Sequence, residues 1–200
     1  MTLFLSDLHL GHPMCRAGKL NKFLASQNKQ QTIYLVGDAI DDATLKCWPT
    51  DHVAAVGEIL AFSRIIYLPG NHDEFMSAVV GLWSNAVTVH SDGFYMVGDR
   101  KYFVTHGHKY DPTMPLVAPR WFRRSVPCTG RFHTKIFSGF LKDRVVKAAQ
   151  KIGCDGVICG HTHRPEHDWV GELEYINCGD WFFSCTAVVE RDGEFKLVEV

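Results

Sequence analysis

The sequence predicts an α/β sandwich with a mixed sheet system. In the first half, near-continuous apolar segments of strand length alternate with amphipathic segments of helical spacing, a pattern typical of largely parallel sheets covered on both faces. In the second half strand segments follow one another more closely, and Asp192-Gly193 predicts a hairpin between the last two. The 200 residues contain no repeat and no linker-like stretch, so we expect one domain over residues 1–200.

The first half is expected to contain three strands and two helices. The apolar, partly β-branched segments Thr2–Ser6, Thr32–Val36 and Arg64–Leu68 predict the strands. Apolar residues at helical spacing predict helices over Ala17–Gln27 and Asp51–Phe62. Strands that alternate with helices in this way favour parallel pairing.

The second half is expected to contain one clear helix among several strands. That helix is predicted over Thr134–Ile152, with Gly153 as its C-cap. Prolines between residues 112 and 132 allow only a short helix there. The apolar face of the long helix is expected to carry Ile136, Phe140, Val145, Ala149 and Ile152. The predicted strands are 86–90, 94–97, 102–105, 156–159, 174–177, 184–190 and 194–200.

The composition excludes several classes of protein. Hydrophobic residues make up 46% and charged residues 22%, which is incompatible with a disordered chain. The net charge of −1 argues against attraction to nucleic acid by bulk electrostatics, so no stable nucleic-acid complex is expected. No apolar stretch predicts a transmembrane segment or a secretory signal. The seven cysteines form no C-x-x-C pair, which indicates reduced thiols and a cytoplasmic protein.

Potential metal ligands follow five of the predicted strands, at the point where each strand ends. In an open α/β sheet the carboxyl ends of the strands border the crevice where ligands bind. Five strands therefore deliver carboxylate, amide and imidazole groups to one edge. These residues are Asp7 and His9; Asp38 and Asp41; Asn71, His72 and Asp73; His106 and His108; and His161 and His163.

The spacing of these residues suits metal binding. Asp7 and His9 are two positions apart, as are His161 and His163, so in extended backbone both members of a pair point to one side. Oxygen and imidazole donors together suit Mn, Fe, Zn or Ni better than an ion that prefers thiolates. A single element has structural alternatives, such as Asp38 as a helix N-cap, but five in order favour a metal site.

As an ordered set, these motifs resemble those of the calcineurin-like metallophosphoesterases. The resemblance implies a calcineurin-like four-layer α/β/β/α sandwich with mixed sheets and a dinuclear metal centre. The motifs that carry it are Asp7-x-His9, Gly37-Asp38-x-x-Asp41, Gly70-Asn71-His72-Asp73, His106 and Gly160-His161-Thr162-His163.

The resemblance also implies a role for each residue. His72 would lie beside the phosphate as the catalytic residue, and Asp73 would orient its ring. The metal ligands would be Asp7, His9 and His163 for the first ion, Asp38 as the bridge, and Asn71, His106 and His161 for the second.

The implied reaction is hydrolysis of a phosphodiester or pyrophosphate bond. Two ions roughly 4 Å apart would lower the pKa of a bridging water, and the resulting hydroxide would attack phosphorus. His72 would protonate the leaving oxygen or stabilise charge on the phosphoryl group. Two divalent ions are expected, manganese first, with Fe, Zn, Ni or Mg as alternatives. A phosphomonoesterase of the same fold, acting on proteins or nucleotides, is the alternative activity, and a non-catalytic scaffold is a third possibility.

A narrower resemblance concerns the substrate. Five segments are similar to the UDP-2,3-diacylglucosamine hydrolases of lipid A synthesis and their relatives: Tyr34–Asp38, Tyr67–Phe75, Asp155–His161, Asn177–Trp181 and Ser184–Ala187. This similarity implies a phosphorylated small molecule as partner, either a nucleotide or a lipid-linked nucleotide sugar, with peripheral membrane binding if the substrate is a lipid. Those hydrolases carry a longer helical cap after the position of His106, and their better-studied branch has Arg at the position of His72, so the substrate stays open.

A short substrate cap is expected at about residues 112–152. Within it the cluster Arg120-Trp121-Phe122-Arg123-Arg124 combines guanidinium groups for phosphate with aromatic faces for a base or an acyl chain. The alternative is a solvated, partly packed helix face. His108 follows a ligand loop and is a candidate substrate contact, and His12 lies close to the first ligand loop.

Overall fold

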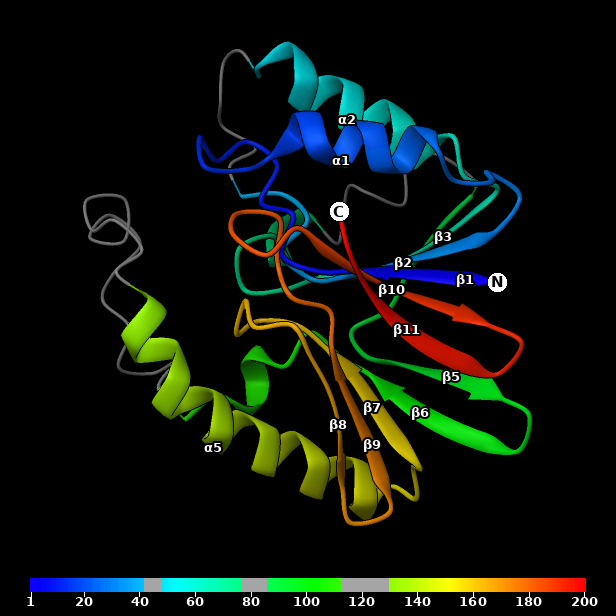
Figure 1. The fold of residues 1–200 in the computed structure, drawn as a ribbon, viewed down its shortest axis with the longest axis vertical. Coiled ribbons are helices and arrows are strands. Elements are labelled where there is room, and N and C mark those ends of the chain that lie inside the picture. Colours follow the sequence, from blue (N-terminus) through cyan, green and yellow to red (C-terminus); the bar gives the residue numbers. More distant parts are fainter. Residues whose placement is uncertain (42–47, 77–85, 113–129) are drawn as a thin grey trace.

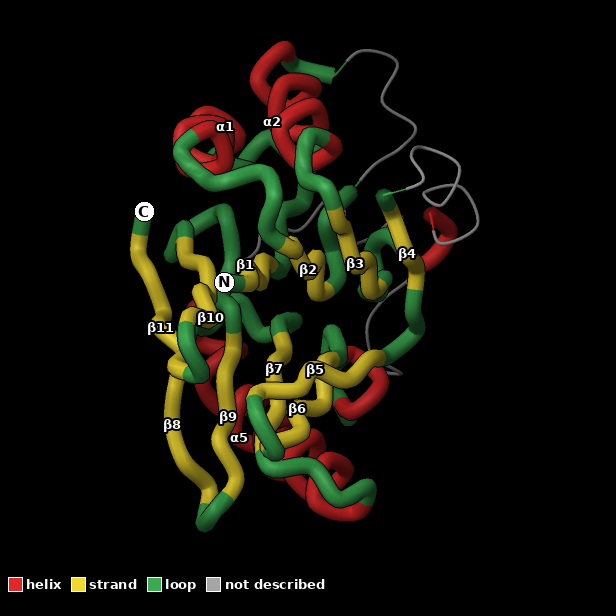
Figure 2. Tube along the Cα trace, turned by 90° about the vertical axis from the view of Figure 1, so that its right-hand side faces the viewer, coloured by secondary structure: helices red, strands yellow, loops and turns green. Residues whose placement is uncertain are grey.

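The computed structural model describes residues 1–41, 48–76, 86–112 and 130–200. Within these ranges two mixed β-sheets lie face to face, and helices cover the outer face of each sheet (Figure 1 and Figure 2). The arrangement confirms the predicted four-layer α/β/β/α sandwich with mixed sheets.

The first sheet has six strands in the order β11-β10-β1-β2-β3-β4, counted over the described ranges. Neighbours from β1 to β4 pair in parallel, whereas β10 pairs antiparallel with both β1 and β11. The strands are β1 (Thr2–Leu5), β2 (Thr32–Val36), β3 (Arg64–Leu68), β4 (Val87–Val89), β10 (Thr186–Arg191) and β11 (Glu194–Glu199). At the predicted hairpin both Asp192 and Gly193 have positive φ, as the tight turn requires.

The second sheet has the order β5-β6-β7-β9-β8 in the described part of the chain. Its centre, β6-β7-β9, is parallel, and the edge strands β5 and β8 are antiparallel to their neighbours. The strands are β5 (Gly93–Val97), β6 (Arg100–Val104), β7 (Gly156–Cys159), β8 (Glu166–Val170) and β9 (Leu173–Asn177). Strand β8 was missing from the sequence prediction because its segment, EHDWV, is largely exposed and lacks alternating apolar residues.

Three α-helices of the described ranges form the outer layers. Helices α1 (Ala17–Ala25) and α2 (Thr50–Leu60) cover the first sheet, and α5 (Gly130–Lys151) covers the second (Figure 1). Two short 3₁₀ helices, η1 (Glu74–Met76) and η2 (His108–Tyr110), follow β3 and β6. None of the described helices is both long and apolar enough to cross a bilayer.

The buried face of α5 differs in part from the prediction. Val145 and Ala149 are buried as expected, but the side chains of Phe140 and Ile152 are 56% and 43% exposed. The helix packs instead through a row that includes Leu141, so its contact stripe is rotated away from Phe140. Ile152 lies beyond the last helical residue and therefore does not share that stripe.

The layers place β1 at the centre of the molecule. Leu3 and Leu5 pack in the core beneath α1 and α2, whereas Phe4 packs in the core between the two sheets. Alternate residues thus bury both faces of the strand, as its continuous apolar sequence predicts. The carboxyl ends of β1, β2, β3, β6 and β7 meet at one edge of the sandwich, and the loops that follow them form the site.

Candidate metal centre

Loops after five strands bring the predicted ligands together. Asp38 belongs to two of the resulting clusters, so it lies between the groups predicted for the first and second metal. In each cluster the ligand atoms lie within 4.8 Å of one another. The clusters are Asp7, His9 and His163; His9, Asp38 and His72; and Asp38, His106 and His161.

The buried carboxylate of Asp7 is fixed through one oxygen and presents the other to the histidines. Oδ2 accepts hydrogen bonds from the backbone amide of His161 at 2.9 Å and from the hydroxyl of Ser6. Oδ1 lies 3.2 Å from Nε2 of His163 and 3.8 Å from Nε2 of His9, and it has no hydrogen-bond partner among the described residues. This bare oxygen is free to bind a cation.

Asp38 is oriented in the same way. Its Oδ1 accepts a hydrogen bond from the backbone amide of His72 at 2.8 Å. Its Oδ2 lies 3.3 Å from Nε2 of His106 and 3.9 Å from Nε2 of His9. Nδ1 of His106 is 2.9 Å from the carbonyl of Val36, which fixes the proton of the neutral ring on Nδ1, so Nε2 is the nitrogen that faces Asp38 and can bind a metal.

In the first cluster, the ligand atoms of two histidines and one carboxylate lie close to one another. Nδ1 of His9 lies 3.2 Å from Asp41, and Nδ1 of His163 lies 3.3 Å from Asp180, so a carboxylate holds the proton on each Nδ1. When both rings are neutral, as metal ligands must be, their Nε2 lone pairs lie 3.3 Å apart beside Oδ1 of Asp7, which has no hydrogen-bond partner among the described residues. Three electron-rich atoms at this separation repel one another unless a proton or a metal cation lies among them. The residues present therefore fit a metal ion.

The electrostatics of the site favour positive charge. Burial lowers the pKa of His9, but Asp41 and Asp7 outweigh it and raise that pKa to about 9. Burial also lowers the pKa of His106, but Asp38 and Asp7 raise it to about 9. A pocket that stabilises imidazolium so strongly stabilises a bound metal cation by the same field.

The backbone at the ligands is held in an uncommon conformation. Five residues of the centre have φ between 48° and 71°, the left-handed region that L-residues rarely adopt. They are Asp7, His9, Asp38, His161 and His163. Such strain persists only where surrounding contacts hold it, and it is typical of functional sites.

Glycines let the ligand loops approach one another. A Cβ at position 70 would lie 2.1 Å from Oδ1 of Asp38, and one at position 160 would lie 1.7 Å from the hydroxyl of Ser6. No side chain fits at either place. Gly70 and Gly160 are therefore required for the close packing of the loops around the two carboxylates.

The ring of His72 contacts a carboxylate other than the expected one. Its Nδ1 lies 2.5 Å from Oδ1 of Asp41, the atom that also contacts His9. Asp73 instead accepts hydrogen bonds from the backbone amides of four residues: Asp38, Ala39, Ile40 and Gly70. The structure thus places Asp41 in the orienting position, because Asp73 points into the loops and joins the β2 loop to the β3 loop.

Three carboxylates beside the histidines were given no role from the sequence, although Asp41 was among the potential ligands. Asp41 contacts His9 and His72, Asp180 contacts His163, and Asp111 lies 2.9 Å from Nε2 of His161. The sequence position of each carboxylate could have indicated that it belongs to the site. Asp41 closes a ligand motif, Asp111 lies just after the loop of His106, and Asp180 lies in a segment that carried the narrower resemblance.

Two further polar side chains at the site lack partners in the described structure. Oδ1 of Asn71, a predicted ligand, is buried and accepts no hydrogen bond. Nδ1 of His108 is likewise buried without a partner, and its ring lies 5.4 Å from that of His106. Burial lowers the pKa of His108 to about 4, with His106 adding to the effect, so the ring is neutral at pH 7. Each atom is thus available to a metal or to substrate.

Arg120, Arg123 and Arg124 lie outside the described residues, as does most of the first half of the predicted cap.

The family of the chain follows from its sequence and fold together. Residues 1–165 match the family described as calcineurin-like phosphoesterase. The chain therefore belongs to that family, and it is a metal-dependent hydrolase of phosphoric esters. No curated protein matches the sequence.

Solved structures with low sequence identity share the fold. A novel archaeal phosphodiesterase matches with a TM-score of 0.58 and 18% identity, over 100% of this chain and 99% of that chain. The phosphoesterase YfcE from E. coli matches with a TM-score of 0.54 and 16% identity, over 100% and 98%. Vps29 of Entamoeba histolytica, solved with zinc, matches with a TM-score of 0.53 and 16% identity, over 100% and 97%.

Proposed function

We propose that this chain hydrolyses a phosphodiester or pyrophosphate bond at a centre of two divalent ions. The observation that carries the proposal is the position of Asp38, whose Oδ2 lies 3.3 Å from Nε2 of His106 and 3.9 Å from Nε2 of His9. One carboxylate oxygen thus faces a histidine of each predicted metal site. We assign Asp7, His9 and His163 to the first ion, with Asn71, His106 and His161 completing the second.

The donor set decides which ions fit. Carboxylate, amide and imidazole donors, with no thiolate, suit manganese, iron, zinc or nickel, and we propose manganese as the first candidate, with magnesium as a further alternative. When bound, two such ions supply an activated water near neutral pH and neutralise charge on the phosphoryl oxygens. The protein contributes a buried pair of carboxylates and imidazoles that are already aimed, so little reorganisation is needed on binding.

His72 is assigned to the substrate. Its side chain is 31% exposed, unlike the ring of His9, which is 4% exposed. The contact with Asp41 engages Nδ1, so Nε2 is the ring nitrogen left for the substrate. Nε2 is then available to donate a proton to the leaving oxygen or to stabilise charge on the phosphoryl group. Asp73 acts as a positioning residue, because it holds the loop that carries His72.

The substrate is proposed from the resemblance to the UDP-2,3-diacylglucosamine hydrolases. The proposed substrate class is a nucleotide or a lipid-linked nucleotide sugar, which the protein would meet in the cytoplasm or at the membrane surface. His108 would contact substrate beside the second ion through its unpaired Nδ1. Arg120, Arg123 and Arg124, in the predicted cap over residues 112–152, would bind its phosphates.

One experiment tests both the activity and the role of His72. The protein is loaded in turn with Mn²⁺, Ni²⁺, Zn²⁺ and Mg²⁺ and assayed on phosphomonoesters, phosphodiesters and UDP-diacylglucosamine. We expect His72→Ala to keep two ions while kcat falls by about 10²–10⁴-fold, with a smaller loss for a p-nitrophenyl ester, whose leaving group needs little protonation. Loss of an ion from the variant would instead make His72 a ligand. Absence of turnover by wild-type protein that holds two ions would refute the proposed function.

A further inference from the structure

Aromatic side chains adjoin the first ligand cluster on one side. The ring of Phe182 lies nearly parallel to that of His9, with 4.7 Å between centroids and 28° between planes. The ring of His12 lies 4.8 Å from Phe182, and the ring of Phe183 meets it edge-on at 6.2 Å. His12, Phe182 and Phe183 are called here the aromatic ledge. It begins in contact with a metal ligand and extends to the surface.

The ledge is held rigidly to the metal centre. Oδ1 of Asp180 accepts hydrogen bonds from the backbone amides of Phe182 at 3.2 Å, Phe183 at 2.8 Å and Ser184 at 2.9 Å. The other oxygen of the same carboxylate lies 3.3 Å from Nδ1 of His163. One side chain thus fixes both a proposed ligand and the loop of the ledge, so binding a substrate there costs little ordering entropy.

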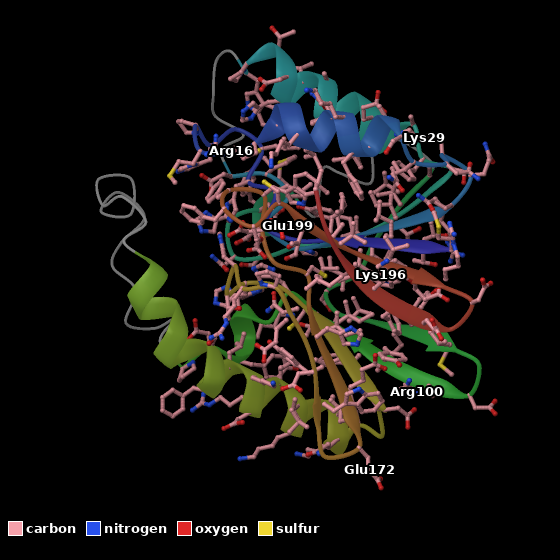
Figure 3. The ribbon with its side chains drawn as sticks, viewed as in Figure 1. Arg16, Lys29, Arg100, Glu172, Lys196 and Glu199 are labelled. Atoms are coloured by element: carbon pink, nitrogen blue, oxygen red, sulfur yellow. The ribbon has the colours of Figure 1, made fainter. Side chains whose placement is uncertain are left out.

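Backbone hydrogen bonds join the two loops of the ledge. The amide of Arg16 donates to the carbonyl of Trp181 at 2.8 Å, and the amide of Trp181 donates to the carbonyl of Asp7 at 3.1 Å. Figure 3 labels Arg16 on the side of the ligand loops, with Lys29 and Arg100 on the opposite side. The ledge therefore shares its support with the ligand Asp7.

The exposed end of the ledge offers both an aromatic face and a hydrogen-bond donor. Phe183 is 65% exposed, whereas Phe182 is 4% exposed. The amide of Met14 donates to Nδ1 of His12 at 3.1 Å, so the neutral ring carries its proton on Nε2. Within the described residues Nε2 has no partner. The apolar ring of Phe183 and the N–H donor of His12 both adjoin Phe182, and together they match an organic group that is planar and bears oxygen.

We propose that the aromatic ledge binds a planar aromatic ring carried by the phosphoester substrate, and that Nε2 of His12 donates to a ring oxygen where the ring bears one, as a nucleobase does. The inference rests on the proposed function, because it places the scissile phosphate at the metal centre. The ring is either a simple aryl group or a nucleobase, and both present the same π-face to Phe183. Alkyl esters gain nothing from this contact.

The test uses three phosphodiesters with the same hexafluoroisopropoxide leaving group, which contains no ring, and a second group that is ethyl, phenyl or 5′-thymidyl. Phe183→Leu keeps the apolar bulk and removes the ring, and Phe183→Tyr keeps the ring. We expect Phe183→Leu to lower kcat/KM by about 3–10-fold for the phenyl and thymidyl esters and by less than about twofold for the ethyl ester. Phe183→Tyr should retain the wild-type preference. Phe94→Leu is the matched control, because Phe94 is 52% exposed on β5 and lies outside the ligand loops.

His12→Phe separates the donor from the ring. It keeps an aromatic neighbour for Phe182 but removes the N–H group, so we expect kcat/KM to fall for the thymidyl ester, which carries acceptor oxygens, and not for the phenyl ester. A selective loss for the thymidyl ester alone in Phe183→Leu identifies the nucleobase as the ring. Equal losses for all three esters in Phe183→Leu, or no loss for any, overturn the proposal.

A binding measurement keeps this inference distinct from the proposed activity. If the wild-type protein hydrolyses none of the esters, the proposed function fails, and the ledge is then tested by calorimetry with phenyl phosphate and ethyl phosphate on zinc-loaded protein. The ledge predicts tighter binding of phenyl phosphate, with the difference lost in Phe183→Leu. Equal affinities for the two phosphates in the wild-type protein would overturn it.

Discussion

Asp41 is the residue whose replacement tests the geometry of the centre most directly. Its Oδ1 lies 3.2 Å from Nδ1 of His9 and 2.5 Å from Nδ1 of His72, so one atom orients a proposed metal ligand and the proposed catalytic ring. Burial alone would raise the pKa of Asp41, but His72 and His9 hold it well below its usual value. The carboxylate is therefore charged at every pH at which the enzyme would be assayed.

The size of the expected effect follows from these two contacts. A carboxylate that orients a metal-bound histidine typically contributes about 10–100-fold to metal affinity or activity. We expect Asp41→Ala to weaken metal binding by about that factor through His9, and to lower kcat at saturating metal by a similar factor through His72. Asp41→Asn keeps an acceptor oxygen but loses the charge. Because a charge-assisted hydrogen bond is about twice as strong as a neutral one, about 3–10-fold is expected on each quantity.

The assay measures the two effects separately. Metal affinity is obtained by competition with a chelator, and kcat on a p-nitrophenyl phosphodiester is measured with metal in excess. Asp143, which is exposed on α5, provides matched controls as Asp143→Ala and Asp143→Asn. If Asp41→Ala binds metal as wild type does and turns over at the wild-type rate, Asp41 orients neither ring and the reasoning fails. A loss of affinity with unchanged kcat would limit its role to His9.

Three further predictions concern the carboxylate between the sites, the loop support and a buried histidine. Asp38→Ala should abolish binding of both ions and activity together; elemental analysis that finds two ions in an active variant would contradict its bridging role. Asp73→Ala should lower the free energy of unfolding by about 3 kcal/mol or more, because four buried amides lose their acceptor at about 1–3 kcal/mol each, and urea unfolding at wild-type stability would contradict this. Burial lowers the pKa of His52, whose Nδ1 accepts a hydrogen bond from the amide of Gly11 at 2.9 Å, so below pH 6.5 the unfolded state binds more protons than the folded state. The contribution of His52 to the free energy of unfolding should therefore fall between pH 7 and pH 5, so that in this window the free energy of unfolding of the wild-type protein declines relative to that of His52→Gln; equal pH slopes for the two proteins would show that His52 does not contribute.

Local sequence was sufficient to predict most of the strands and helices, because the strands at the centre of the fold are buried on both faces. Their continuous apolar segments, such as Ile33 to Val36, are typical of buried β-strands. Edge strand β8 is different, since backbone pairing with β9 stabilises it while most of its side chains face solvent. On α5, several stripes of apolar residues were compatible with the sequence, and contact with β7 and β9 selected the one that includes Leu141.

What the sequence by itself determined was the order of the ligands along the chain and the strand that each one follows. Parallel strands of one sheet end on the same side, so chain order alone brings Asp7 and Asp38 to one edge, whereas the packing of the second sheet on the first brings His161 there. Only the tertiary structure decided which oxygen holds each imidazole proton, because those partners come from other loops: Asp41 is 32 positions from His9, and Asp111 is 50 positions from His161. Hydrogen bonds of this kind depend on the distance between loops after the sheets have packed, and no local pattern in the chain encodes that distance.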